Sequence, residues 1–230
     1  MKVKGLILSL ALLLGVSSAW AEDNVSVVRP LTIKAGKTQK VAIVLENATA
    51  YTAFQMDIKL PTGLTLSNPK SRRTSDATFH NITASAVDGV TRVVALSYKE
   101  EADGSVKAGN GNLNFIDGNS EIILFFDITA AADYADTGNI EVKNVKFVKA
   151  DGTTQAMTDA SSATGRILGD VNGDDGVTAN DASLILQGVA GKIGLTVKQK
   201  DAGNVNFDED GVTAQDASLI LQKIAGKVDL

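Results

Sequence analysis

Oxygen-bearing side chains recur at every second position in a short polar segment near the end of the chain. The segment opens at Asp170, and another acid, Asp181, follows eleven residues later. This alternation turns three side chains toward one centre, and oxygen ligands at positions 1, 3, 5 and 12 are typical of a calcium loop of the EF-hand type. The backbone carbonyl of position 7 and the residue at position 9, directly or through water, complete the set. The expected ligands of this first loop are Asp170, Asn172, Asp174, Gly176, Thr178 and Asp181.

The first loop departs from the usual EF-hand pattern in two places. Position 6, usually glycine, is Asp175, although aspartate tolerates the left-handed backbone conformation better than most residues. The last ligand is Asp181 instead of glutamate, so the side chain is one methylene shorter. Asp181 is also a candidate N-cap of the helix that follows. The alternative interpretation is an acidic turn that caps a helix and binds no metal.

The loop belongs to an internal repeat. Residues 176–192 and 211–227 are identical at 14 of 17 positions, at a fixed offset of 35 residues. Each copy continues into an amphipathic helix, and Gly191 marks the expected end of the first one. No helical pattern precedes the first loop, and a short helix is expected over 196–202. The apolar stripe of the first helix is Ala182, Ile185, Leu186 and Val189.

The second loop is less regular than the first. Counting forward from Asn204 gives the right alternation, but Asp216 then lies one residue too late. The extra residue is expected around Glu209–Asp210, and asparagine at position 1 carries less charge than aspartate. We therefore predict a second calcium site that is weaker or differently arranged, with a calcium-free loop as the alternative. Its candidate ligands are Asn204, Asn206, Asp208, Asp210, Thr213 and Asp216.

The segment 169–228 resembles a type I dockerin. The likeness rests on the opening Gly169–Asp174, on the run Asp181–Gln187 and on the duplication. It implies a small calcium-dependent module that binds cohesin domains and attaches proteins to multi-protein assemblies, often those that degrade plant polysaccharide. The family's common Ser-Thr pair is absent, so no particular partner is implied, but the near-identity of the two copies suggests two binding orientations. The positions that contact cohesin in this family correspond here to Ala179, Asn180, Gln187, Ala214, Gln215 and Gln222.

The residues between 22 and 157 follow a period of two. Phe54–Leu60 alternates apolar and polar residues, the pattern of a strand with one buried face. Ile122–Phe126 is apolar on both faces and is predicted to be central, and a change of phase at Lys143–Asn144 suggests a bulge. Because turn signals separate these runs and no helical patterns intervene, we predict an all-β sandwich. Its strands are expected near 41–45, 54–60, 90–98, 121–129 and 140–147.

Two stretches of this body, residues 35–68 and 139–152, resemble a cohesin domain. Cohesins are jelly-roll β-sandwiches that bind dockerins. The resemblance implies a cohesin-like domain over 22–157, a linker over 158–168 and the dockerin-like module over 169–230. Carbohydrate-binding and adhesin sandwiches share much of the pattern, and it assigns no binding residue on the body.

Residues 1–21 have the pattern of a secretory signal peptide. Lys2 and Lys4 precede an apolar run that is too short to span a bilayer comfortably, and Ala19–Ala21 forms a small-x-small cleavage site. We therefore expect cleavage after Ala21 and export of a soluble protein, either secreted or held at the cell surface. No second apolar run of membrane length occurs, so no membrane span is expected.

Residue composition and charge argue against several classes of site and function. The chain has no cysteine and a formal net charge of −5, which argue against disulfides, thiolate metal sites and a general nucleic-acid binder. Residues 169–230 hold ten of the 27 acidic residues against five lysines, an excess that a cation would neutralise. His80 is the single histidine, and no pair of acids is singled out for catalysis, so no enzyme activity is expected.

These patterns together predict a non-catalytic secreted adaptor that joins multi-protein assemblies through calcium-dependent cohesin–dockerin interaction. The expected cofactor is Ca²⁺ at two sites. The expected partners are proteins that bear cohesin or dockerin modules, including further copies of this chain, and not nucleic acid. The alternative is a carbohydrate-binding or adhesin sandwich anchored by a dockerin. Sugar sites usually present aromatic platforms, and the chain without its signal peptide keeps Tyr51, Tyr98 and Tyr134 but loses Trp20.

Overall fold

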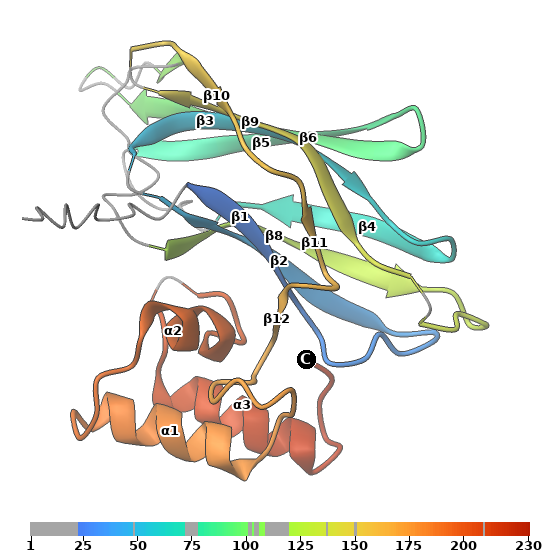
Figure 1. Cartoon of the computed structure of the whole chain (residues 1–230), viewed down its shortest axis with the longest axis vertical. Helices are drawn as coiled ribbons and strands as arrows, with labels where there is room; N and C mark the ends of the chain where they lie inside the picture. The colour runs from blue at the N-terminus through green and yellow to red at the C-terminus, as the bar shows by residue number, and fades with distance from the viewer. Residues whose placement is uncertain are drawn as a thin grey trace, which may run out of the picture.

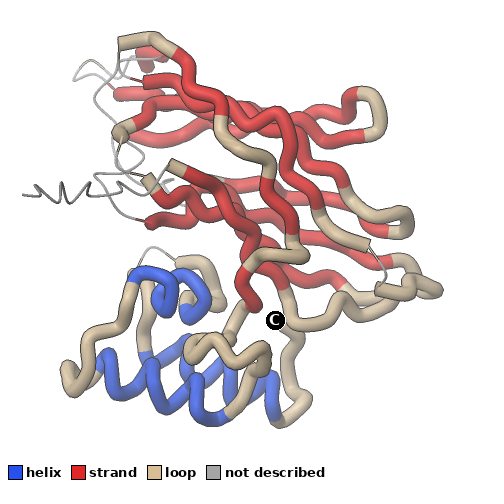
Figure 2. Tube along the Cα trace, in the orientation of Figure 1, coloured by secondary structure: helices blue, strands red, loops and turns tan. Residues whose placement is uncertain are grey.

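A computed structural model describes residues 23–47, 49–71, 78–100, 103, 106–108, 120–136, 138–149, 151–208 and 210–230. In this part of the chain two β-sheets face each other, and three helices lie against the outer side of one sheet (Figure 1). The strands and the helices form separate layers (Figure 2). The prediction of a β-sandwich followed by a helical module is therefore confirmed. The predicted signal peptide lies outside the described residues.

The first sheet has five strands within the described residues, with β2 in its middle and β8 beside it. β12 runs parallel to β1, and the other strand pairs are antiparallel. In order across the sheet, the strands are β12 (Arg166–Ile167), β1 (Asn24–Arg29), β2 (Thr38–Glu46), β8 (Ser120–Ala130) and β4 (Leu64–Lys70).

The second sheet is antiparallel in all the strand pairs that the described residues form. In order, its strands are β10 (Thr154–Ala156), β9 (Glu141–Lys149), β3 (Tyr51–Lys59), β6 (Val90–Glu100) and β5 (Thr78–Val87). Two short strands extend it, because β11 (Ala160–Ser161) pairs with β9 and β7 (Val106–Ala108) pairs with β6.

The core of the sandwich is built from the inward-facing residues of both sheets. Tyr51 and Phe54 both pack on Phe147, with ring centroids 4.9 Å and 5.7 Å apart, and all three side chains are buried. The Tyr51 hydroxyl donates to the buried Asp23 carboxylate at 2.6 Å, and burial, followed by that carboxylate, raises the pKa of Tyr51. Tyr51 is therefore a core residue and cannot stack on a sugar.

The strands expected from the alternating and the continuous apolar runs are present as β2, β3, β6, β8 and β9. The predicted bulge is present as well. The register of β3 against β9 shifts between Gln55 and Asp57, and Asn144 has a φ of 52°. An extra residue in β9 therefore changes the phase of its side chains, as the sequence indicated.

The two central strands of the first sheet are buried on both faces, and the helices are the reason. Residues 41–45 of β2 are all fully buried. Val41, Ile43 and Leu45 belong to the sandwich core, whereas Ala42 and Val44 belong to a second hydrophobic cluster that includes the helices. Ile122–Phe126, the run predicted to be central, lies in β8 between β2 and β4. The structure adds that the helical module covers the outer face.

The helical module contains α1 (Ala179–Val189), α2 (Val197–Gly203) and α3 (Ala214–Ile224). α2 is the short helix expected over 196–202. Each helix begins with a capping box, in which a threonine N-cap and the residue three positions later accept each other's backbone amides.

The prediction that Asp181 is the N-cap of the first helix is wrong. Thr178 is the N-cap, and Asp181 is the N3 residue, whose carboxylate accepts the Thr178 amide at 2.8 Å. The reason is that a threonine three residues before an acid forms a capping box. The two side chains then accept two backbone amides at the start of the helix, whereas an aspartate N-cap alone would accept one.

The segment 158–168, expected to be a linker, is structured. It contains β11 and β12, which extend the two sheets. Ser162 and Ile140 exchange two hydrogen bonds of 2.9 Å, and the Leu168 amide donates to the Arg29 carbonyl at 2.7 Å. The sandwich therefore continues past residue 157 and is joined directly to the helical module.

Searched over its described residues, the chain offers no helix with the length and hydrophobicity that a bilayer crossing requires.

An ion pair in the second sheet makes the stability of the sandwich depend on pH. Asp57 accepts two hydrogen bonds from Arg92, at 2.7 Å and 2.8 Å, and one from Asn144 at 2.9 Å. The Arg92 bonds in particular hold the pKa of Asp57 below its ordinary value, although burial opposes them. Because the folded pKa lies below the unfolded one, this stability is present above the unfolded value of about 3.9 and is lost as the pH falls through the folded pKa.

We expect Asp57→Asn to lower the free energy of unfolding by about 2 kcal/mol near neutral pH. The effect should shrink as the pH falls below about 4, because Asp57 of the unfolded chain then takes up a proton and the folded carboxylate does so at lower pH. Denaturant titrations at both pH values measure this. Asp88→Asn, the same change in an exposed turn, serves as the control and should stay within about 0.5 kcal/mol of wild type. A loss for Asp57→Asn that does not vary with pH would contradict the prediction.

Candidate calcium loops and docking helices

The two loops are built alike around the buried aspartate at the start of each long helix. Asp181 accepts the Val171 amide at 2.8 Å, and Asp216 accepts the Val205 amide at 2.9 Å. The second oxygen of each aspartate accepts the amide of its N-cap threonine at 2.8 Å. The repeated bonds make Asn204 position 1 of the second loop, and the extra residue lies further along, as the spacing predicted.

Hydrogen bonds within the first loop bring its predicted ligands together. Asp170 accepts the amides of Gly173, Asp174 and Asp175 at 2.7, 3.2 and 2.9 Å. Asn172 Nδ2 donates to Asp174 Oδ2 at 2.8 Å. Asp175 has a φ of 64°, the left-handed conformation expected for an aspartate at position 6. Positions 1, 3 and 5 therefore lie around one loop, with the acid at position 12 bonded to its backbone.

Both loops disfavour the ionised form of a buried acid. Burial raises the pKa of Asp170, the loop amides oppose this, and the Asp181 carboxylate adds to the rise. Burial also raises the pKa of Asp216, against hydrogen bonds from Thr213 and the loop backbone. A bound cation would relieve this penalty, since it favours the charged carboxylate.

Two buried oxygens of the second loop have no hydrogen-bond partner in the structure, namely Asn204 Oδ1 and Asp208 Oδ1. Asn204 is 2% exposed, and its amide nitrogen donates to the Asp208 carbonyl at 3.0 Å. A buried acceptor without a donor costs about 1–3 kcal/mol. Both oxygens belong to ligand positions, 1 and 5, and both are hard ligands of the kind that Ca²⁺ prefers. The residues of the second loop therefore fit a calcium ion.

The remaining candidate ligands lie in the same two loops. A Cβ at Gly176 would lie 3.1 Å from Asp174 Oδ1, so glycine leaves this oxygen room. Asp210 is exposed, and Thr213 is the N-cap of α3. Within the described residues no three His, Cys, Asp or Glu side chains lie close enough to hold a metal ion. The predicted ligand sets therefore depend on asparagine and backbone oxygens as well as carboxylates, and calcium binding stays a prediction.

The apolar stripe predicted for the first helix is divided between a buried and an exposed part. Ala182 and Ile185 are buried, whereas Leu186 and Val189 are 45% and 50% exposed. The helix packs on α3 and joins the apolar cluster beneath the first sheet through only part of its apolar surface, so the rest of the stripe remains open.

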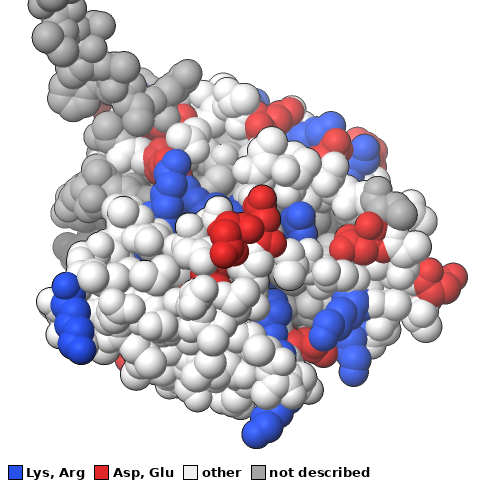
Figure 3. Space-filling model, turned by 60° about the horizontal axis from the view of Figure 1, so that its bottom comes forward, with Lys and Arg blue, Asp and Glu red and all other residues white. Residues whose placement is uncertain are grey.

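The same division recurs in the second copy, where Leu221 and Ile224 of α3 are 45% and 48% exposed. Turning the underside of the molecule forward shows a broad helical surface without charged side chains at its centre (Figure 3). The positions that the dockerin resemblance assigns to partner binding are exposed or half-buried. They are Ala179, Asn180, Gln187, Ala214, Gln215 and Gln222.

The sequence analysis missed the packing of the helical module on the sandwich. Phe207 of the second loop stacks on Phe125 of β8, with ring centroids 5.6 Å apart and an interplanar angle of 28°. Two sequence signals pointed to such a contact. The central strands are apolar on both faces, and Phe207 stands where the first loop has Gly173.

No protein-family model and no curated protein matches the sequence. Among solved structures, a cohesin module of a family 33 glycoside hydrolase from Clostridium perfringens is 13% identical, covers 63% of this chain and 96% of that module, and has a TM-score of 0.43. The sixth cohesin of scaffoldin B from Acetivibrio cellulolyticus, solved with a dockerin, is 14% identical, with 60% and 96% coverage and a TM-score of 0.42. A non-cellulosomal cohesin from Archaeoglobus fulgidus is 10% identical, with 63% and 91% coverage and a TM-score of 0.38. These sequence identities and TM-scores are too low to assign a function to the chain.

Proposed function

We propose that this chain is a secreted, non-catalytic adaptor whose helical module docks on a partner in a calcium-dependent manner, as type I dockerins dock on cohesins. The duplicated loop–helix unit supports this most directly, because two packed helices each expose a pair of aliphatic side chains at equivalent positions. Calcium would act through the loops. Asp181 and Asp216 join each loop to the start of its helix, so an ordered loop fixes the position of the exposed helix face.

The β-sandwich is proposed as a cohesin-like receiver for the dockerin of another protein. The helical module covers the first sheet, so the outer face of the second sheet is the one left for a partner. Leu96 of β6 is 42% exposed on that sheet. A chain with both halves would link modules in series or associate head to tail with further copies of itself.

Sedimentation velocity of the chain, in calcium and in chelator, tests self-association, and calorimetry against a panel of cohesin and dockerin modules tests the two partner sites. We expect complexes that form in calcium and dissociate in chelator. A strict monomer at high concentration would exclude head-to-tail association. Failure to bind any module of either kind in calcium would contradict the adaptor proposal.

Charged substitutions on the exposed helix faces should separate one binding orientation from two. Leu186→Asp and Leu221→Asp should each weaken cohesin binding by about two-fold, because the other copy remains available. The double variant should lose about 30-fold or more, as expected when both central apolar anchors are lost. Val197→Asp, at an exposed position of α2 outside the repeat, is the matched control. If either single variant abolishes binding in calorimetry, only one orientation is used.

Carbohydrate binding, the alternative function, has little support in the described aromatic residues. Tyr51 is fully buried, and Tyr134 is half-buried and packs against the sandwich core. Absence of a mobility shift in affinity gels that contain plant polysaccharides would remove this alternative.

A further inference from the structure

The contact between the helical module and the sandwich is an apolar layer that both halves contribute to. The outer face of the first sheet supplies Val28, Ala42, Val44 and Ile122. From the module, Val171 of the first loop and Val205 and Phe207 of the second join the same cluster, together with buried residues of α1 and α3. Because loop residues take part, the shape of the loops and the packing of the sheet are not independent.

Phe207 makes the most direct connection between a loop and the sheet. It lies in the second loop between Asn206 and Asp208, two of the predicted ligands. It is 3% exposed and stacks on Phe125 of β8. Its φ is 59°, in the left-handed region, which a bulky side chain adopts only when its surroundings compensate for the strain. The stacking of Phe207 on Phe125 of the sheet compensates for this backbone strain.

The first loop lacks this connection. Its equivalent residue is Gly173, which has a φ of 74° without strain, and a Cβ placed there would meet no atom within 4 Å. The chain therefore holds a matched pair of loops. One has a glycine in open space at position 4, and the other has a buried phenylalanine that the sandwich holds in place.

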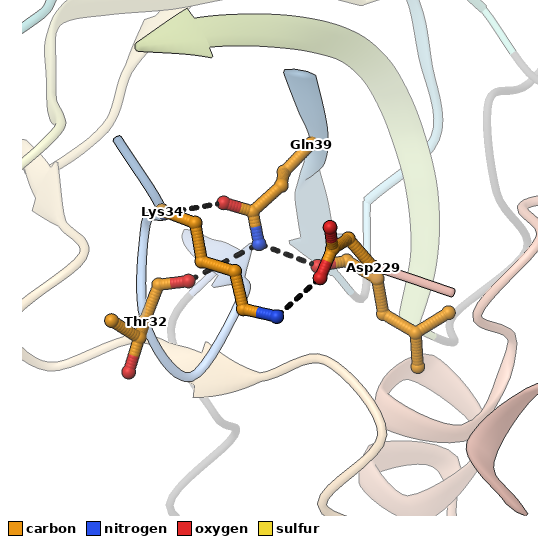
Figure 4. Close-up of polar contacts among 5 residues, drawn as sticks. Thr32, Lys34, Gln39 and Asp229 are labelled. Carbon is orange, nitrogen blue, oxygen red and sulfur yellow. Dashed lines mark hydrogen bonds and ion pairs between the residues drawn. The ribbon is translucent and has the colours of Figure 1, made fainter. Parts of the chain in front are cut away.

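Polar contacts at two further points keep the module on the sheet. Arg166 of β12 bonds to Asp201 of α2 at 2.7 Å and forms an ion pair with Glu46 of β2. Gln39 of β2 donates to the Leu230 carbonyl at 2.9 Å, while Lys34 pairs with Asp229 (Figure 4). None of these contacts involves the Phe125 or Phe207 side chain, so changing the aromatic pair removes none of them directly.

We infer that the sandwich sets the calcium affinity of the second loop, because Phe125 holds Phe207 in the strained conformation that places the neighbouring ligands. The inference rests on the calcium binding proposed above. It makes Phe125 a positioning residue for a metal loop in another part of the chain. By reciprocity, calcium in the second loop strengthens the contact of the module with its own sandwich. The first loop has glycine at this position and no aromatic contact with Phe125, so Phe125 should not affect its calcium binding.

Calcium titration of the ¹⁵N-labelled chain, followed by nuclear magnetic resonance, tests this loop by loop. The Gly173 and Gly211 amides report on the first and second loop respectively. We expect Phe125→Ala to weaken calcium binding at the second loop on the order of ten-fold and to leave the first loop unchanged. Phe125→Tyr, which keeps the ring, should retain the wild-type affinity. Leu96→Ala, an exposed apolar residue on the other sheet, is the matched control.

A double-mutant cycle tests whether Phe125 affects calcium binding through its contact with Phe207. Phe207→Gly gives the second loop the residue that the first loop has and removes the ring that Phe125 contacts. In that background, Phe125→Ala should change calcium affinity by no more than about two-fold. If Phe125→Ala leaves the second loop unchanged, or acts equally with and without Phe207, the inference is overturned while calcium binding stands. If neither loop of the wild-type chain binds calcium, the calcium proposal fails and the inference fails with it.

Discussion

Replacing Asp216 by alanine is expected to lower the free energy of unfolding of the helical module by about 3 kcal/mol. The carboxylate is fully buried and accepts the Val205 amide at 2.9 Å, the Thr213 amide at 2.8 Å and the Thr213 hydroxyl at 3.0 Å. Alanine would leave these donors without their acceptor and would remove the capping box of α3. Guanidinium denaturation in chelator, followed by far-ultraviolet circular dichroism, measures this loss without a metal contribution.

Asp210→Ala is the matched control for this experiment. It removes an acid of the same loop, but its side chain is exposed, so we expect a change within about 0.5 kcal/mol. An equal, small effect of both variants would show that Asp216 does not hold the loop to the helix in solution.

Calcium is expected to stabilise the helical module by about 4 kcal/mol for each site when the free ion exceeds the dissociation constant a thousand-fold. The reason is that the ligands come together only in the folded loops, so binding energy becomes folding energy. In chelator we expect α1 and α3 to melt at a lower temperature. They should not be lost outright, because the first sheet covers part of their apolar surface. Calorimetric melting in calcium and in chelator measures the difference.

Variants at position 5 of the two loops measure how much each calcium site contributes to the stabilisation. Asp174→Ala and Asp208→Ala should each remove the contribution of one site, and Asp208→Ala should remove the smaller part if the second site is the weaker one. Magnesium should stabilise less than calcium, since it demands a stricter octahedral geometry. Identical melting curves in calcium and chelator would rule out metal binding by both loops.

Local patterns predicted most of the elements of this fold. Alternating and continuous apolar runs predicted five of the strands, β2, β3, β6, β8 and β9, but not β5, which is as long as these, and the phase change in β9 predicted its bulge. Spacing predicted that Asn204 takes the place of Asp170 in the second loop, and the hydrogen bonds to Asp181 and Asp216 bear that out. These features are set by neighbours in the sequence, and for that reason a single sequence reveals them.

Features that depend on distant contacts were missed. The segment 158–168 looked like a linker because it is small and polar, yet it pairs with β9 and β1. The apolar stripe of the first helix was predicted, but its division into a buried part and the exposed Leu186 and Val189 was not, because a helical period does not tell how much of an apolar face is covered.

The sequence by itself determined two duplicated loops with calcium-type ligands, the helices that follow them and a preceding β-sandwich. Only the tertiary structure decided that the module packs on its own sandwich, that Phe207 reaches Phe125, and that two oxygens of the second loop lack a donor. The physical reason is that an apolar run, such as residues 41–45, records that both faces of a strand are buried but not what buries them. Which element packs on each face of a strand is determined by the tertiary structure.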